Sequence, residues 1–253
     1  MIRDIANKSA WWMIDHSLGL VSIQTHLCRV FGPGQRGALL PLIRYRARFM
    51  VLPGETAVLV GIFSDGTVRR FLDAVTKTGM VVVIEANPAN VARIQRRLGH
   101  RRNLIFVNKA VWTDRGTMAF IASDVETTQG YNRIKTSEIA DYPYHMEQQV
   151  TEITVECDRL DAILKDLKLG RIDHINLTCN GAEVAALDSI QDLIRTQPHL
   201  RIYANTQAPS PYREYIDRLQ EYGFKYHVTP VRKVRNKQIE LNRVYAYLPQ
   251  SDV

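Results

Sequence analysis

The residues best suited to bind a nucleoside are a glycine turn and an acid that follows one strand later. Gly61 ends the apolar run 57–60, and Gly66 follows after four intervening residues. A turn of this kind brings backbone N–H groups and a helix N-terminus beside a ligand. Glu85 ends the next apolar run, 80–84, where a carboxylate can accept hydrogen bonds from two ribose hydroxyls. The pattern therefore predicts a nucleoside-containing cofactor between Gly61 and Glu85.

The glycine turn alone does not decide between a ligand site and an ordinary strand-to-helix turn. Its G-x-x-x-x-G spacing is neither the dinucleotide fingerprint nor the phosphate-binding loop, because no Lys followed by Ser or Thr comes after Gly66. Glu85, followed by Ala86-Asn87-Pro88, favours the ligand site.

The segments around these residues alternate between apolar strands and amphipathic helices. The predicted strands are 57–60, 80–84, 104–107, 118–122, 153–156, 173–178 and 200–204, with a final pair at 224–228 and 244–248. The predicted helices are 67–78, 182–194 and 212–222, with two more that begin at Pro88 and Arg159. This order implies an α/β fold with a doubly wound, mostly parallel sheet and one antiparallel strand near the end. Ligands of such sheets bind outside the carboxyl ends of the strands, where we expect Gly61, Glu85, Asn108, Thr178 and Asn205 to converge.

Two parts of the chain stand apart from this alternation. Residues 1–53 are predicted to be a helical extension, either a cap on the core or an amphipathic segment that contacts an anionic membrane surface. Residues 54–253 then form the cofactor-binding domain. Within it, strand 118–122 is expected to give an antiparallel hairpin after the third strand. The polar and aromatic stretch 124–150, which contains His145, is equally consistent with a lid over the substrate and with a surface insertion.

Composition narrows the class of protein. The chain has 253 residues, a net charge of +7 and three widely spaced cysteines, so we expect neither a disulfide framework nor a metal site, and a reduced, cytoplasmic setting fits best. The basic helix 93–102 carries five arginines that could bind phosphates, but a solvated helix face is the favoured interpretation and nucleic acid is not the expected partner.

Five short segments of the sequence resemble, in the same order, motifs of the FkbM family of S-adenosylmethionine-dependent methyltransferases. They are Leu59-Val60-Gly61-Ile62, Glu85-Ala86-Asn87-Pro88, the turn 110–116, Arg159-Leu160-Asp161, and the family's K-I-D-V-E-G-A-E segment, here 176–183. The resemblance covers about residues 55–248. It implies a class I, Rossmann-like methyltransferase fold and a cofactor that leaves as S-adenosylhomocysteine. It also implies methylation of hydroxyl oxygens on sugars or other small molecules.

The same resemblance assigns parts of the cofactor to residues of this chain. The methionine part would lie on the glycine turn, formed by Gly61, Ile62, Phe63, Ser64 and Gly66. The ribose would lie on Glu85, Ala86 and Asn87, and the adenine beside Asn108, Lys109 and Ala110. Asn176, at the start of the K-I-D-V-E-G-A-E segment, is also expected at the cofactor.

The acids of that segment are partly replaced. Asn176, Thr178 and Asn180 stand where the family has lysine, aspartate and glutamate, whereas Glu183 is retained. Threonine and asparagine form hydrogen bonds but cannot take up a proton near neutral pH. Either a base lies elsewhere, or the chemistry is lost and the chain is a silent cofactor-binding or scaffold protein, with a nucleic-acid methyltransferase or binder as a further alternative. The candidate catalytic residues are Asp65, His145, Thr178, Asn180 and Glu183; for His174 a structural role is favoured.

Overall fold

The computed structural model describes residues 49–62, 64–123, 132–135, 150–208, 210–230 and 240–249. The predicted helical extension before residue 49, Phe63, His145 and most of the 124–150 stretch lie outside these residues. Among the residues that are described, no helix is both long and apolar enough to span a membrane.

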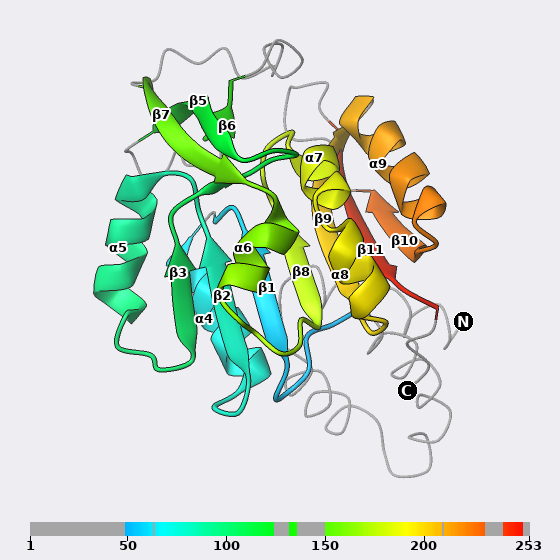
Figure 1. Cartoon of the computed structure of the whole chain (residues 1–253), viewed down its shortest axis with the longest axis horizontal. Coiled ribbons are helices and arrows are strands. Elements are labelled where there is room, and N and C mark those ends of the chain that lie inside the picture. Colours follow the sequence, from blue (N-terminus) through cyan, green and yellow to red (C-terminus); the bar gives the residue numbers. More distant parts are fainter. Residues whose placement is uncertain are drawn as a thin grey trace.

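A seven-stranded sheet forms the centre of the fold, with strand order β10-β11-β9-β8-β1-β2-β3 (Figure 1). Its strands are β1 (Thr56–Val60), β2 (Met80–Ile84), β3 (Leu104–Val107), β8 (His174–Leu177), β9 (Arg201–Ala208), β10 (Lys225–Pro230) and β11 (Glu240–Tyr247). The first five of these pair in parallel, whereas β11 runs antiparallel to both β9 and β10. The prediction of a mostly parallel sheet with one antiparallel strand near the end is therefore confirmed.

Helices cover both faces of the sheet. Successive strand residues point to opposite sides, so an apolar strand gives the sheet two apolar faces, and each is buried against helices. Ala57 and Leu59 of β1 pack in one cluster with α4 (Asp65–Val75) and α5 (Pro88–Leu98). Val58 and Val60 pack in the other with α6 (Leu160–Asp166), α7 (Glu183–Asp188) and α9 (Ser210–Glu221). The central strands β1, β2 and β8 are thus buried on both faces, as expected for a parallel sheet.

A second, four-stranded sheet lies at one end of the first (Figure 1). Its order is β4-β7-β5-β6, formed by β4 (Ala110–Val111), β5 (Gly116–Ser123), β6 (Arg133–Ile134) and β7 (Val150–Asp158). β5 pairs antiparallel with β7 along its whole length, so the antiparallel pairing expected after the third strand is present, but its partner is the distant β7 and not the segment just before the turn 113–116. The physical reason is length, since the nine-residue β7 can pair with all of β5, whereas β4, just before the turn, has two residues.

The helix predicted for 182–194 is two helices, α7 and α8 (Gln191–Thr196). The break comes at Ser189, which is fully buried and serves α6 instead of continuing its own helix. Its hydroxyl accepts a hydrogen bond from the N–H of Leu160, and its carbonyl accepts one from the N–H of Asp161. The helix predicted for 67–78 also differs, because α4 begins at Asp65 and ends where Thr76 takes a positive φ of 63°.

Candidate active site

A pocket opens where the carboxyl ends of β8, β1 and β2 meet the residues that follow β3. It contains about 460 Å³ of empty space, part of which is open to solvent. Its lining comes from both sheets: Val60, Gly61, Ile62, Ile84, Glu85, Ala86, Lys109, Ala110, Val111, Phe120, Asn132, Ile134, Thr178, Cys179, Asn180 and Ala182. The expected convergence holds for the strand ends at Gly61, Glu85 and Thr178.

Gly61 allows the ends of β1 and β8 to approach closely. Its φ is +75°, and its N–H donates to the carbonyl of Ile84. A Cβ at this position would lie 2.3 Å from the carbonyl oxygen of Thr178, which is far inside van der Waals contact. The hydroxyl of Thr178 in turn donates to the carbonyl oxygen of Gly61 at 2.8 Å. The first glycine of the turn is therefore required by the geometry of the pocket floor.

Glu85 is a buried carboxylate held in place by backbone N–H groups. Ile62 N–H donates to its Oε2 at 2.9 Å, and Asn87 N–H donates to its Oε1 at 2.8 Å. Each carboxylate oxygen has further acceptor capacity, so the group can still accept hydrogen bonds from a ligand diol. Burial raises the pKa of Glu85 to about 7, although the two backbone N–H groups act in the opposite direction.

Two asparagines hold the backbone around Glu85. Asn108 donates from Nδ2 to the carbonyl oxygens of Glu85 and Ala86. Asn87 caps α5 by accepting from the N–H of Ala89, and its Nδ2 donates to the carbonyl of Ser123 in β5. Both residues were expected to touch the cofactor; neither lines the pocket, and their bonds position residues that do.

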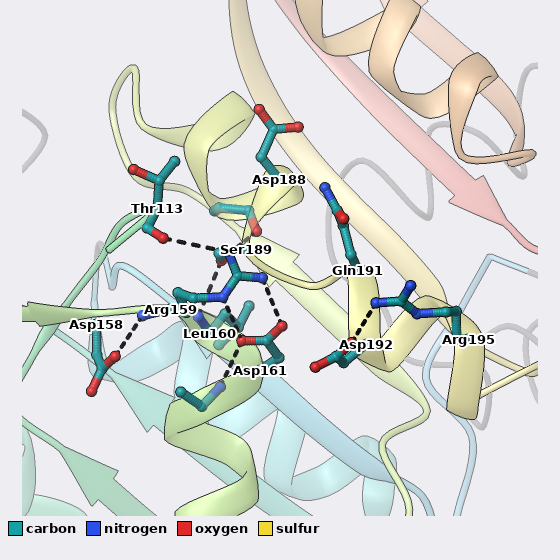
Figure 2. A network of polar contacts seen from close by, with 12 residues as sticks. Thr113, Asp158, Arg159, Leu160, Asp161, Asp188, Ser189, Gln191, Asp192 and Arg195 are labelled. Carbon is teal, nitrogen blue, oxygen red and sulfur yellow. Dashed lines mark hydrogen bonds and ion pairs between the residues drawn. The ribbon is translucent and has the colours of Figure 1, made fainter. Parts of the chain in front are cut away.

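Lys109 places a positive charge at the pocket and is held by Asp158. Its Nζ lies 3.5 Å from Asp158 Oδ2, while Asp158 Oδ1 accepts from the N–H of Arg159. Figure 2 shows how the network continues: the Arg159 guanidinium binds both oxygens of Asp161 and donates to the carbonyl of Thr113. This network ties the pocket wall to the start of α6.

The turn after β8 is held together by Glu183. Its Oε1 accepts from the N–H of Cys179 at 3.0 Å and its Oε2 from the N–H of Gly181 at 2.9 Å. Between them Asn180 takes a φ of +52° and donates from Nδ2 to the carbonyl of Asn132 at 2.7 Å. Glu183 is 1% exposed, and burial raises its pKa to about 7. Its carboxylate thus shapes the turn from behind the pocket.

A family model for the Methyltransferase FkbM domain matches residues 58–226. The chain belongs to the FkbM methyltransferase family. The match spans the whole pocket, from the end of β1 to the turn after β8, and the family implies S-adenosylmethionine as the cofactor. The fold is that of the class I methyltransferases. No curated protein sequence matches the chain.

The chain also matches solved structures at identities of 12–14% and TM-scores below 0.5. Precorrin-6y C5,15-methyltransferase from Geobacter metallireducens is 14% identical, with 80% of this chain and 84% of that chain covered and a TM-score of 0.45. Aeropyrum pernix fibrillarin with natively bound S-adenosyl-L-methionine is 12% identical, with coverages of 78% and 67% and a TM-score of 0.46. An S-adenosylmethionine-dependent methyltransferase from Aquifex aeolicus is 13% identical, with coverages of 88% and 96% and a TM-score of 0.43.

The residues of this FkbM-family pocket fit the implied cofactor. A side chain at Gly61 would fill the floor, and Glu85 presents acceptors suited to a ribose diol. Phe120 and Ile134, both about 5% exposed or less, form an apolar wall suited to a planar base. Ala86, Lys109 and Ala110 line the pocket as the family resemblance implies.

Other predicted site residues lie outside this lining. Asp65 pairs with Arg93 at 3.8 Å and Arg97 at 3.3 Å, and so joins α4 to α5. Ser64 caps α4 by accepting from the N–H of Thr67. The remaining residues of this group are Gly66, Asn87, Asn108, Asn176, Glu183 and Asn205, while His145 and Phe63 are outside the described residues.

His174, a candidate base in the sequence, is the first residue of β8. The pocket lies at the other end of that strand. Burial lowers the pKa of His174 to about 3. It therefore stays neutral in the working range of pH, in agreement with the structural role favoured for it.

Sequence reasoning missed the part of the pocket that the second sheet supplies. Phe120, Asn132 and Ile134 come from β5 and from the residues around β6, and they carry no recognised motif. The continuous apolar run 118–122 gave a usable signal for a strand that contains Phe120. Asn132 lies in an aperiodic polar stretch, where only the pairing of β6 with β5 reveals its position.

Proposed function

We propose that this protein transfers a methyl group from S-adenosylmethionine to a hydroxyl oxygen of a small molecule or glycan. The observation that supports the proposal is the pairing of Gly61 and Glu85 in one pocket, with the carboxylate oriented by the N–H groups of Ile62 and Asn87. When bound, the cofactor supplies an electrophilic methyl group on a sulfonium. The protein supplies binding and orientation around it.

Each side of the pocket has a distinct part in this proposal. Glu85 receives the ribose hydroxyls at the end of β2, and the apolar wall receives the base. Because the strand order is β8-β1-β2-β3, the amino-acid part extends toward β1 and β8. The methyl acceptor then approaches from the side of Thr178 and Asn180, whose polar groups can orient a hydroxyl by hydrogen bonding.

Orientation is the main catalytic contribution in this proposal. Among the described lining residues Glu85 is the one carboxylate, and backbone N–H groups and the ribose engage it. Holding reactants in line can supply roughly 7–11 kcal/mol, whereas a general base adds roughly 10²–10⁴-fold. The acceptor therefore releases its proton to water or to a residue outside the described lining, and an acidic hydroxyl suits the site best.

Binding and transfer are tested in sequence. Titration calorimetry with S-adenosylmethionine and S-adenosylhomocysteine is expected to show one site per chain for each compound. A radiolabelled methyl donor, incubated with hydroxylated acceptors of increasing acidity, is then expected to label the more acidic ones first. Absence of binding to both nucleosides would refute the proposal.

A silent cofactor-binding protein is the second candidate. It is favoured by the observation that Glu183, the acid retained from the family segment, accepts two backbone N–H bonds and does not line the pocket. This candidate predicts nucleoside binding with no labelled product from any acceptor. The same calorimetry and transfer assays therefore separate the two candidates.

A further inference from the structure

Asn132 is fixed over the pocket by two hydrogen bonds to different elements. Its Oδ1 accepts from the N–H of Ser123, the last residue of β5, at 2.7 Å. Its carbonyl oxygen accepts from Nδ2 of Asn180, in the turn after β8, at 2.7 Å. The residue is 8% exposed and lines the pocket. One hydrogen bond thus holds the side chain of Asn132 and the other holds its main chain, in the lining of the pocket.

The side-chain nitrogen of Asn132 is a buried donor without a partner among the described residues. The orientation of the amide group follows from its partner. The backbone N–H of Ser123 can only donate, so the atom that faces it is the amide oxygen and the other atom is Nδ2. Buried donors are nearly always satisfied, and an exception requires an explanation. A ligand atom that accepts this hydrogen bond provides one.

The position of Asn132 indicates which part of a ligand it meets. The main-chain carbonyl of Asn132 bonds Asn180 after β8, whereas its side chain bonds Ser123, whose carbonyl accepts from Asn87 after β2. Asn132 therefore spans the pocket between the β2 side and the β8 side. Glu85 follows β2, and Lys109 follows β3 and is already paired with Asp158. If the ribose lies at Glu85 and the base lies toward Lys109, the amino-acid part of the cofactor extends toward the β8 side. That part carries one strong acceptor, its α-carboxylate.

We propose that Asn132 is a binding residue that donates from Nδ2 to the α-carboxylate of the cofactor. The inference rests on the proposed function and adds a residue that recognises the amino-acid part. A sulfonium would be repelled by the positive end of an N–H dipole, whereas a carboxylate forms a charge-assisted hydrogen bond with it. Asn132 therefore selects for ligands that keep the carboxylate.

The test compares two ligands that differ in the amino-acid part. S-adenosylhomocysteine carries the carboxylate, and 5′-methylthioadenosine lacks the whole amino-acid part while keeping the nucleoside and the sulfur. Asn132→Asp keeps the oxygen that accepts from Ser123 but replaces the free N–H donor by an acceptor. At pH 8 we expect it to weaken binding of S-adenosylhomocysteine by about tenfold or more and to leave binding of 5′-methylthioadenosine within about twofold of the wild type.

Two further variants make the comparison specific. Gln95→Glu makes the same amide-to-acid change on the exposed side of α5 and is expected to bind both nucleosides as the wild type does. Asn132→Leu removes the donor without adding charge and is expected to show the same selective loss as Asn132→Asp. Circular dichroism and thermal melts establish that each variant is folded before calorimetry.

The possible outcomes separate this inference from the proposed function. If the wild type binds S-adenosylhomocysteine and both Asn132 variants bind it equally well, the inference is overturned and the proposed function stands. Equal weakening of both nucleosides also overturns it, because Asn132 would then support only the pocket wall. Failure of the wild type to bind S-adenosylhomocysteine overturns the proposed function, and the inference with it.

Discussion

Glu85 and Glu183 form a natural pair for testing which carboxylate binds the cofactor. Both are almost completely buried, both accept two backbone N–H bonds, and burial raises the pKa of each to about 7. Only Glu85 lines the described pocket. We therefore expect Glu85→Gln and Glu183→Gln to perturb folding to a similar extent, and only Glu85→Gln to weaken cofactor binding.

The size of the binding effect follows from the number of hydrogen bonds at stake. A carboxylate offers two oxygens to a ribose diol, whereas a carboxamide offers one oxygen and presents a competing donor. A hydrogen bond to a charged group contributes about 1.5–3 kcal/mol. Loss of one such bond therefore corresponds to an increase in Kd of about 10- to 150-fold at 25 °C.

Calorimetry with S-adenosylhomocysteine at pH 8, where Glu85 is largely ionised, measures this effect directly. The expected result is an increase of Kd in that range for Glu85→Gln and a change of less than about threefold for Glu183→Gln. An equal loss of affinity in the two variants would mean that the carboxylate of Glu85 affects binding only by holding the backbone N–H groups in place. Wild-type affinity in Glu85→Gln would refute the assignment of the ribose to this residue.

Three more predictions concern stability, each measured by urea unfolding. Gly61→Ala is expected to destabilise the protein by more than about 2 kcal/mol, because φ is positive and the new Cβ would lie 2.3 Å from a carbonyl oxygen. Gly66→Ala has room for a Cβ in α4 and should stabilise the protein by up to about 1 kcal/mol. Equal effects of the two substitutions would contradict this interpretation of the turn. Because the folded-state pKa values of Glu85 and Glu183 are about 7, above the ordinary 4.5, their stabilising contribution is complete below pH 4.5 and is lost as the pH rises to 7. Each glutamate should lower the unfolding free energy by about 3 kcal/mol over that interval. If a Gln variant shows the same dependence of unfolding free energy on pH as the wild type, the raised pKa of that glutamate is contradicted. Ser189→Ala should cost about 1–3 kcal/mol by leaving the first N–H of α6 unpaired (Figure 2), and a cost below about 0.5 kcal/mol would show that this hydroxyl does not hold α6.

The sheet was predictable because strands buried on both faces appear as continuous apolar runs. Residues 80–84 and 104–107 were assigned as strands with the bounds that β2 and β3 have. Pairings between distant segments were harder to predict. The partner of β5 is β7, separated from it by a long aperiodic stretch, and the break at Ser189 interrupts an apolar spacing that reads as one helix.

The site was predictable where residue type and backbone geometry agree. Gly61 and Glu85 are such positions, because a positive φ and a strand-end carboxylate have recognisable residue types. Sequence reasoning could not tell a carboxylate that faces the ligand from one that faces the backbone. Glu183 was therefore expected to be catalytic, although its oxygens bind the N–H groups of its own turn.

The position of β11 has a consequence for how the molecule is made. This strand lies between β9 and β10, both of which precede it in the chain, and it pairs with each of them. During synthesis on the ribosome the central sheet therefore stays open until residue 247 has emerged. A premature stop after residue 239 would leave β9 and β10 with unpaired edges, and such a nascent chain would be a target for chaperones and proteases.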